Sequence, residues 1–244
     1  MRVRTALTVA GSDCGGGAGL QADLKTFLDR GIYGMSVVTA VTAQNSRGVR
    51  AVSLVEPGLV REQLRAIFDD LPVDAMKTGM LGDAHIIDTL CDVLEGLPSR
   101  PRLVVDPVML AKDGTSLLEP RALDALRRRL FPLATLVTPN LPEAAALGGI
   151  QGDVLLKGGH GEGAWVIDRL TIAGSERRFR HRRIDTFDTH GTGCTLSAAI
   201  TAELAKGAAL DTACATGIRY VAGLIRRGGG EGLGGGAGPL LPGL

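Results

Sequence analysis

The stretch DTHGTGCTLSAAI, residues 188–200, contains a Gly-Thr-Gly-Cys turn directly before a run that predicts a helix. The turn residues are Gly191, Thr192, Gly193 and Cys194. Free backbone N–H groups and the helix dipole attract anions at such a start, so the stretch predicts a phosphate or oxyanion site. A tight turn that needs flexible glycine would explain the same residues. The dipole also lowers the pKa of the Cys194 thiol unless the thiol is buried in apolar surroundings.

Other interpretations of this stretch have less support. It is not a Walker A loop, because no Gly-Lys-Ser/Thr follows. His190 suggests a Cys–His catalytic pair with Cys194, but a hydrolase nucleophile would also need an orienting third group, which cannot be placed. The loop at residues 11–19, GSDCGGGAG, follows a strand pattern but lacks the acidic partner of a dinucleotide-binding fingerprint.

Around this stretch, short Val/Leu-rich runs alternate with longer amphipathic ones. The runs predict strands at 5–10, 34–43, 73–79, 102–109, 135–140 and 153–159, and helices at 20–30, 57–70, 83–94, 120–130, 142–147, 192–206 and 210–226. Two antiparallel strands are expected at 163–174 and 176–185. Strands that alternate with helices predict an α/β fold with a mostly parallel sheet and helices on both faces.

Composition narrows the class of protein. The 244 residues, 45% of them hydrophobic, predict one domain over residues 1–244, with a glycine-rich tail from about 228 that is either loose or closely draped. The net charge of +1 offers no field for nucleic acid or an anionic membrane, and no apolar run approaches the ~20 residues that span a bilayer. Four cysteines without paired short spacing indicate neither a zinc site nor a disulfide framework, which favours a reducing cytoplasm.

Polar residues follow all six predicted parallel strands, where α/β proteins bind ligands. They are Gly11-Ser12-Asp13, Gln44-Asn45, Lys77-Thr78-Gly79, Asp106, Asn140 with Glu143, and Lys157-Gly158-Gly159. Asp106 and Glu143 could supply oxygen ligands for Mg²⁺, and either Lys112 or Lys157 could place positive charge over a moving phosphoryl group. Residues 109–115 have the composition of a mobile flap. Each residue alone is an ordinary cap or turn residue, but together they predict a ligand cleft.

Seven segments taken in order resemble the hydroxymethylpyrimidine (phosphate) kinase family of thiamine biosynthesis, within the ribokinase superfamily. They are ALTVAGSDCGGGAGLQADLKTF, GMSVVTAVTAQNSRGV, DAMKTGML, VVDPVMLAKDG, LVTPNLPEAAAL, LLKGGH and DTHGTGCTLSAAI. The resemblance implies a three-layer α/β/α ribokinase-like fold and ATP-dependent phosphorylation of 4-amino-5-hydroxymethyl-2-methylpyrimidine, and then of its monophosphate. It also implies ATP and Mg²⁺ as cofactors and a homodimer, with no nucleic-acid or membrane partner.

The same resemblance implies roles for individual residues. Asp23 and Gln44 would hydrogen-bond the pyrimidine, and Gly11, Met80 and Val108 would line its pocket. Residues 191–193 would form the anion hole, with Cys194 facing the substrate hydroxymethyl group. The residues implied for nucleotide phosphates and Mg²⁺ are Asn140, Glu143 and Lys157, with Asp106 nearby.

Three features depart from the family pattern. Cys14-Gly15 replaces the usual Pro-Ser or similar pair, the helix expected between Gly149 and Asp153 is missing, and the tail lacks its usual histidine. Two alternatives therefore stay open: a pyridoxal kinase of the same family, or a catalytically silent pyrimidine-binding protein. The sequence does not decide whether the second phosphorylation is retained, whether pyridoxal is a side substrate, or which oligomer forms.

Overall fold

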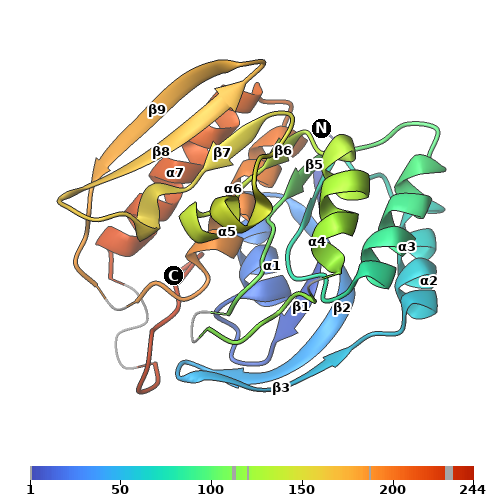
Figure 1. Cartoon of the computed structure of the whole chain (residues 1–244), viewed down its shortest axis with the longest axis horizontal. Helices are drawn as coiled ribbons and strands as arrows, with labels where there is room; N and C mark the ends of the chain where they lie inside the picture. Colours follow the sequence, from blue (N-terminus) through green and yellow to red (C-terminus); the bar gives the residue numbers. More distant parts are fainter. Residues whose placement is uncertain (1, 112–113, 120, 187, 229–232) are drawn as a thin grey trace.

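A central sheet organises the protein, shown here as a computed structural model that describes residues 2–111, 114–119, 121–186, 188–228 and 233–244. Nine strands within these ranges are ordered β3-β2-β1-β4-β5-β6-β7-β8-β9 (Figure 1). Their bounds are β1 Thr5–Asp13, β2 Tyr33–Asn45, β3 Gly48–Leu54, β4 Ala75–Thr78, β5 Arg102–Val105, β6 Leu136–Val137, β7 Val154–Leu156, β8 Trp165–Ile172 and β9 Ser175–Arg182. The six strands β2, β1, β4, β5, β6 and β7, in sheet order, are parallel, whereas β3 at one edge and β8 and β9 at the other pair antiparallel. This arrangement confirms the predicted α/β class.

Helices cover both faces of the sheet, so the fold has three layers (Figure 1). One face carries α1 (Gly19–Asp29), α6 (Thr192–Ala205) and α7 (Leu210–Arg226). The other carries α2 (Pro57–Phe68), α3 (Ala84–Glu95) and α4 (Ala122–Ala125), and the short α5 (Leu141–Leu147) follows β6. The described residues form two hydrophobic cores, one on each face of the sheet, and successive strand residues point into different ones. Ala75 packs with α1 and α6, whereas Met76 packs with α2 and α3. Burial on both faces explains the nearly continuous apolar strands.

Local chemistry sets several helix starts. Pro57 occupies the first turn of α2, as predicted, and the Glu56 side chain accepts a hydrogen bond from the Gly58 amide at 2.8 Å. Asp83 caps α3 by accepting from the Ile86 amide at 2.8 Å. These caps satisfy backbone donors that have no partner inside the helix.

The strand β3 was not predicted from the sequence. It pairs antiparallel with β2, but its residues are mostly exposed, so it has no apolar periodicity to reveal it. The strand predicted over 102–109 ends at Val105, because Pro107 cannot donate to a sheet ladder. The helix predicted over 120–130 is α4 followed by a wider turn over 126–130 and a tight one over 131–133, and residue 120 lies outside the described ranges.

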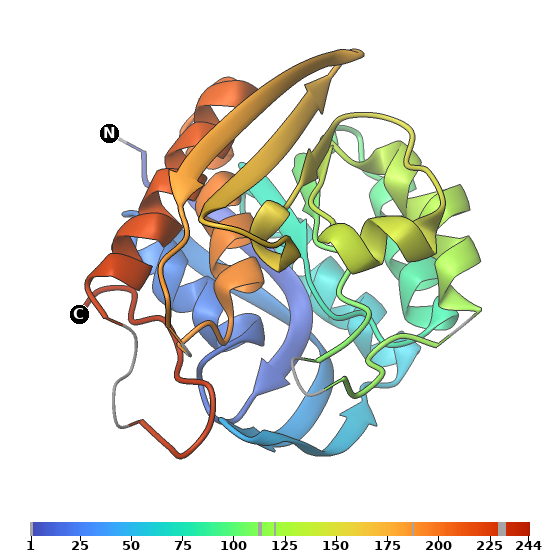
Figure 2. The same cartoon turned by 60° about the vertical axis from the view of Figure 1, so that its left-hand side comes forward.

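The crossover between β6 and β7 is as short as the sequence predicts. Gly148 ends α5 in the left-handed conformation, at φ 67°, and the chain enters β7 at Val154 without a further helix. Figure 2 shows β8 and β9 as a long hairpin at the edge of the sheet. Across the described ranges, no helix has both the length and the apolar character needed to cross a lipid bilayer.

Candidate active site

A cavity of about 1360 Å³ opens at the carboxyl ends of the parallel strands. Most of the residues singled out in the sequence line it: Gly11, Gln44, Met80, Asp106, Val108, Asn140, Glu143, Lys157, Gly191, Thr192, Gly193 and Cys194. Lys112 lies outside the described residues. The cavity thus gathers segments from β1, β2, β4, β5, β6 and β7 at the edge where a parallel sheet binds ligands.

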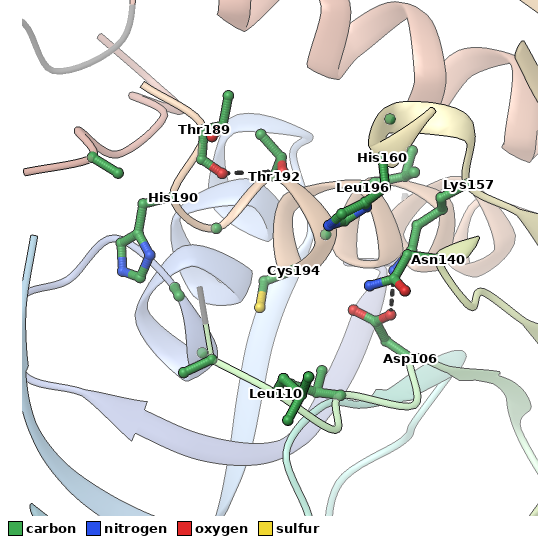
Figure 3. Close-up of a pocket in the computed structure, with 18 of the residues that line it drawn as sticks. Asp106, Leu110, Asn140, Lys157, His160, Thr189, His190, Thr192, Cys194 and Leu196 are labelled. Atoms are coloured by element: carbon green, nitrogen blue, oxygen red, sulfur yellow. Dashed lines mark hydrogen bonds and ion pairs between the residues drawn. The ribbon is translucent and has the colours of Figure 1, made fainter. Parts of the chain in front are cut away.

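The turn at residues 191–194 forms the N-terminus of α6. Gly191 adopts φ +76°, and a Cβ there would overlap the Gly17 carbonyl oxygen, so only glycine fits. No side chain within the described residues caps this helix, and the Thr192 amide donates to the Thr189 carbonyl at 3.5 Å, which leaves the Gly193 and Cys194 N–H groups for an anion. The position of a Cβ at Gly193 lies 3.5 Å from both Asp106 Oδ2 and Lys157 Nζ, so this anion turn adjoins the lysine–carboxylate pair (Figure 3).

The Cys194 thiol lines the cavity at the start of α6, with Asp106 and Lys157 to its right in Figure 3. Burial raises the pKa of Cys194 to about 11, the Lys77 ammonium opposes this shift, and the Asp23 and Asp106 carboxylates add to it. The lowering expected from the helix dipole is therefore outweighed by desolvation. Cys194 is a neutral thiol at physiological pH, and the Cys–His pair has no support in this electrostatic setting.

Lys157 and two carboxyl groups form the opposite wall. Lys157 Nζ lies 2.6 Å from Asp106 Oδ1 and 4.0 Å from Glu143 Oε2. Glu143 also closes a capping box with Asn140: its Oε2 accepts from the Asn140 amide at 2.7 Å, and Asn140 Oδ1 accepts from the Glu143 amide at 2.8 Å. Burial raises the pKa of Glu143 to about 7, with the nearby Lys157 opposing the shift.

The carboxyl groups suit Mg²⁺ held jointly with phosphates. No three potential ligands among His, Cys, Asp and Glu gather into a metal cluster within the described ranges. Mg²⁺ in phosphoryl-transfer sites commonly binds through one or two carboxylates, with phosphate oxygens and water completing its shell. Asp106 and Glu143 offer this donor set, and the Lys157 ammonium lies beside both carboxyl groups.

Asp23 does not occupy the position expected for a substrate ligand. Its side chain is fully buried, accepts hydrogen bonds from Lys77 Nζ at 2.8 Å and Thr8 Oγ1 at 2.7 Å, and is absent from the described cavity lining. The prediction that Asp23 binds the pyrimidine directly is therefore corrected: its carboxylate neutralises Lys77 beneath the cavity. The equally buried Lys77 was noted only as a polar residue at a strand end.

Two further polar groups have contacts that the sequence does not show. The Arg183 guanidinium donates to the carbonyls of Gly159, Gly161 and Gly163 at 2.8, 2.6 and 2.9 Å, and so holds the glycine-rich loop after Lys157. Asp13 accepts from the amides of the first loop and contacts His190. The Arg183 bonds span 20–24 residues and the Asp13–His190 contact spans 177, so no local pattern indicates them.

Beyond the anion turn and Lys157, one wall of the cavity is apolar. This wall comprises Val166, Leu196, Val221, Ala222 and Ile225. This wall lies next to the loop at 159–163 that Arg183 holds, and it suits a flat ring that is attached to phosphates bound at the anion turn. Gln44, near the end of β2, lies at the other end of the cavity, where the Cys14 thiol donates to its carbonyl oxygen at 3.1 Å.

Comparison with known proteins gives consistent matches over most of the chain. A family model described as phosphomethylpyrimidine kinase matches residues 13–153 and 150–241. The hydroxymethylpyrimidine/phosphomethylpyrimidine kinase of Streptomyces coelicolor is 46% identical over 253 residues, which cover 96% of this chain and 92% of that protein. The thiamine biosynthesis bifunctional protein ThiED of Geobacter sulfurreducens is 46% identical over 96% of this chain, which spans 51% of that protein. An ADP complex of Bacillus subtilis pyridoxal kinase has a TM-score of 0.87 and 36% identity, over 99% of this chain and 98% of that one.

Proposed function

Since the chain belongs to the phosphomethylpyrimidine kinase family, we propose that it transfers the γ-phosphoryl group of ATP to 4-amino-5-hydroxymethyl-2-methylpyrimidine and then to the resulting monophosphate. The product is the pyrimidine diphosphate used in thiamine biosynthesis. The observation that carries the proposal is the anion turn at residues 191–194 beside Lys157 and Asp106, in a cavity with an apolar wall on one side and Gln44 on the other.

The chain's own residues supply positioning and charge. The Gln44 amide offers both a donor and an acceptor to a pyrimidine edge, and Met80 and Val108 supply apolar contact for the ring. The anion turn and Lys157 would hold the phosphoryl group as negative charge shifts during transfer. Asn140 lies beside the same groups, and Cys194 would direct its neutral S–H toward the oxygen of the hydroxymethyl group.

Asp106 and Glu143 would hold Mg²⁺ together with the nucleotide phosphates. Bound there, the metal would neutralise charge on the phosphates. Lys157 lies beside both carboxyl groups, and it would shift toward the phosphates when the metal binds there. The continuous sheet supports a single kinase domain over residues 1–244. A homodimer is a further part of the proposal, which light scattering at several protein concentrations would test.

One incubation tests the reaction. The protein is mixed with Mg-ATP and the pyrimidine alcohol, and chromatography resolves the monophosphate from the diphosphate. We expect the monophosphate to form first and the diphosphate to follow. Accumulation of monophosphate alone would limit the proposal to the first step. Tight calorimetric binding of the pyrimidine without ADP release would contradict it and favour a binding protein.

Pyridoxal kinase activity is the second candidate, because the chain is 36% identical to a solved pyridoxal kinase. Pyridoxal also presents a hydroxymethyl group on a methylated nitrogen ring. Parallel steady-state measurements with both alcohols decide between them, and a higher kcat/KM for pyridoxal would reverse the assignment.

A further inference from the structure

The glycine-rich C-terminal segment, residues 233–244, reaches the cavity. Figure 2 draws this segment (red) beside the turn between β2 and β3, and two of its residues, Gly236 and Ala237, line the cavity (Figure 2). Leu240, four residues past Gly236, is only 4% exposed. The segment is therefore docked at this point, and its glycine content needs an explanation other than flexibility.

The first contact is with the β2–β3 turn. The Ala237 amide donates to the Ser46 carbonyl at 3.0 Å, and the Gly236 amide donates to Ser46 Oγ at 3.2 Å. A Cβ at Gly236 would overlap the Ser46 carbonyl oxygen. Glycine is thus required for the close approach of two backbones. Ser46 is two residues from Gln44, which we place against the pyrimidine.

The second contact is with the residues that lead into the anion turn. The His190 amide donates to the Gly238 carbonyl at 3.1 Å, and the Gly238 amide donates to Asp188 Oδ1 at 3.1 Å. His190 and Pro239 form a parallel bridge. His190 immediately precedes Gly191, so these bonds fix the entry to the turn that carries Cys194.

The third contact links the first loop to the same assembly. His190 Nε2 lies 3.0 Å from Asp13 Oδ2, and Asp13 is 1% exposed. Asp13 also accepts from the amides of Gly15, Gly17 and Ala18 at 2.8, 3.1 and 2.8 Å. Thus one segment joins, through His190, three loops that border the same end of the cavity.

We infer that residues 236–240, here named the strap, are a positioning element for the pyrimidine. They hold the turn after Gln44 and the turn before Cys194 at a fixed separation. Asn140 and Lys157 follow β6 and β7, in the other half of the sheet, and belong to the nucleotide side. Disturbing the strap should therefore weaken pyrimidine binding and alignment more than nucleotide binding, of which only the phosphoryl group at the anion turn lies near the strap. The choice of substrate in this inference rests on the proposed function.

The test uses two strap variants and a matched control in the full chain. Gly236→Val introduces the overlap with Ser46, and the milder Ser46→Ala removes only the hydroxyl that accepts from Gly236. Gly223→Val is the control, because a Cβ at Gly223 on α7 has no described neighbour within 4 Å. We expect Gly236→Val to raise the KM for the pyrimidine about tenfold, from two lost hydrogen bonds, with a smaller rise for Ser46→Ala. The KM for ATP should stay within about twofold of wild type in every variant, because the described hydrogen bonds of the strap do not reach Asn140 or Lys157, which we place on the nucleotide.

Hydrogen exchange gives a readout that does not depend on the substrate. Backbone amides at residues 188–191 should exchange faster in Gly236→Val than in wild type and in Gly223→Val, without a matching loss of thermal stability. Unchanged exchange there, or equal rises in the KM values of both substrates, would overturn the strap. If wild type fails to phosphorylate the pyrimidine, the proposed function falls, while the exchange data still decide the strap. Should Gly236→Val fail to fold, Ser46→Ala carries both measurements.

Discussion

The pH dependence of phosphoryl transfer should distinguish two roles for Cys194. Its thiol pKa of about 11 leaves a thiolate fraction on the order of 10⁻⁴ at pH 7. Bound Mg-ATP carries net negative charge and would not favour the thiolate further. Phosphoryl transfer through a loose transition state also requires little proton removal early in the reaction. We therefore expect Cys194 to act as a hydrogen-bonding thiol and not as a preformed base.

The assay is the single-turnover rate at saturating Mg-ATP and pyrimidine between pH 7.5 and 9.5. This window lies above the raised pKa of Glu143, about 7, so that Glu143 is mostly ionised throughout and its titration changes the rate by less than about twofold. A thiolate base with a pKa near 11 would raise the rate tenfold per pH unit, or about 100-fold across the window. A neutral thiol would leave the rate nearly constant, which is the expected result.

Two substitutions complete the test. Cys194→Ser keeps a donor of similar size and should retain the wild-type rate within about tenfold, whereas Cys194→Ala should lower it roughly 10- to 100-fold through one lost hydrogen bond at the reacting oxygen. The KM for the pyrimidine should change little in both. A unit slope of log rate against pH in wild type that Cys194→Ser abolishes would refute this reasoning and restore the thiolate as base.

Three other perturbations follow from the contacts at the site. Lys77→Met leaves the buried Asp23 carboxylate unpaired, so it should lower the free energy of unfolding by about 3–5 kcal/mol in urea titrations. The double variant Lys77→Met/Asp23→Asn should regain most of this loss. A loss below about 1 kcal/mol in Lys77→Met would argue against a buried charge pair. Arg183→Ala removes the three hydrogen bonds that hold the loop at 159–163, so it should raise the KM for ATP several-fold and leave the KM for the pyrimidine unchanged. Arg178→Ala, at an exposed position, is the control. Equal effects of the two variants would show that Arg183 does not support ATP binding. Because Glu143 has a raised pKa of about 7 and binds metal only when ionised, lowering the pH from 8 to 6 should raise the Mg²⁺ concentration for half-maximal rate about tenfold, an effect that Glu143→Gln should abolish.

The sequence predicts the parallel sheet and most of the cavity because both depend on local signals. Asn140 follows a strand and begins a helix, and its capping box with Glu143 spans only three residues. The strand-end rule then places these groups together without knowledge of any contact. The strand β3 is not predicted in this way, because its residues are mostly exposed and show no periodic apolar pattern.

The missed and corrected features all depend on partners far apart in the chain. Asp23 is 54 residues from Lys77, and a helix position alone does not show whether a carboxylate faces the cavity or the sheet beneath it. Likewise, glycines at 234–236 predict the absence of a helix but not the serine, about 190 residues earlier, that requires their backbone to approach closely. Composition identifies which backbone conformations a segment can adopt, and only the fold identifies what it contacts.

The same distinction explains the pKa of Cys194, which the sequence predicts to be lowered only if the thiol is not buried. The helix dipole is a local property that the sequence displays, and it lowers the pKa of a thiol at a helix N-terminus. Desolvation and the carboxylates of Asp23 and Asp106 come from other segments, and they raise the pKa of the thiol to about 11 although the Lys77 ammonium opposes them. A site that stabilises a transferred phosphate thus need not stabilise a thiolate. The phosphate would bind the backbone N–H groups of the turn and Lys157, whereas the sulfur of Cys194 lies near the Asp23 and Asp106 carboxylates. Anion binding by the turn and acidity of its cysteine are therefore separate properties, and only the first follows from the Gly-Thr-Gly-Cys sequence.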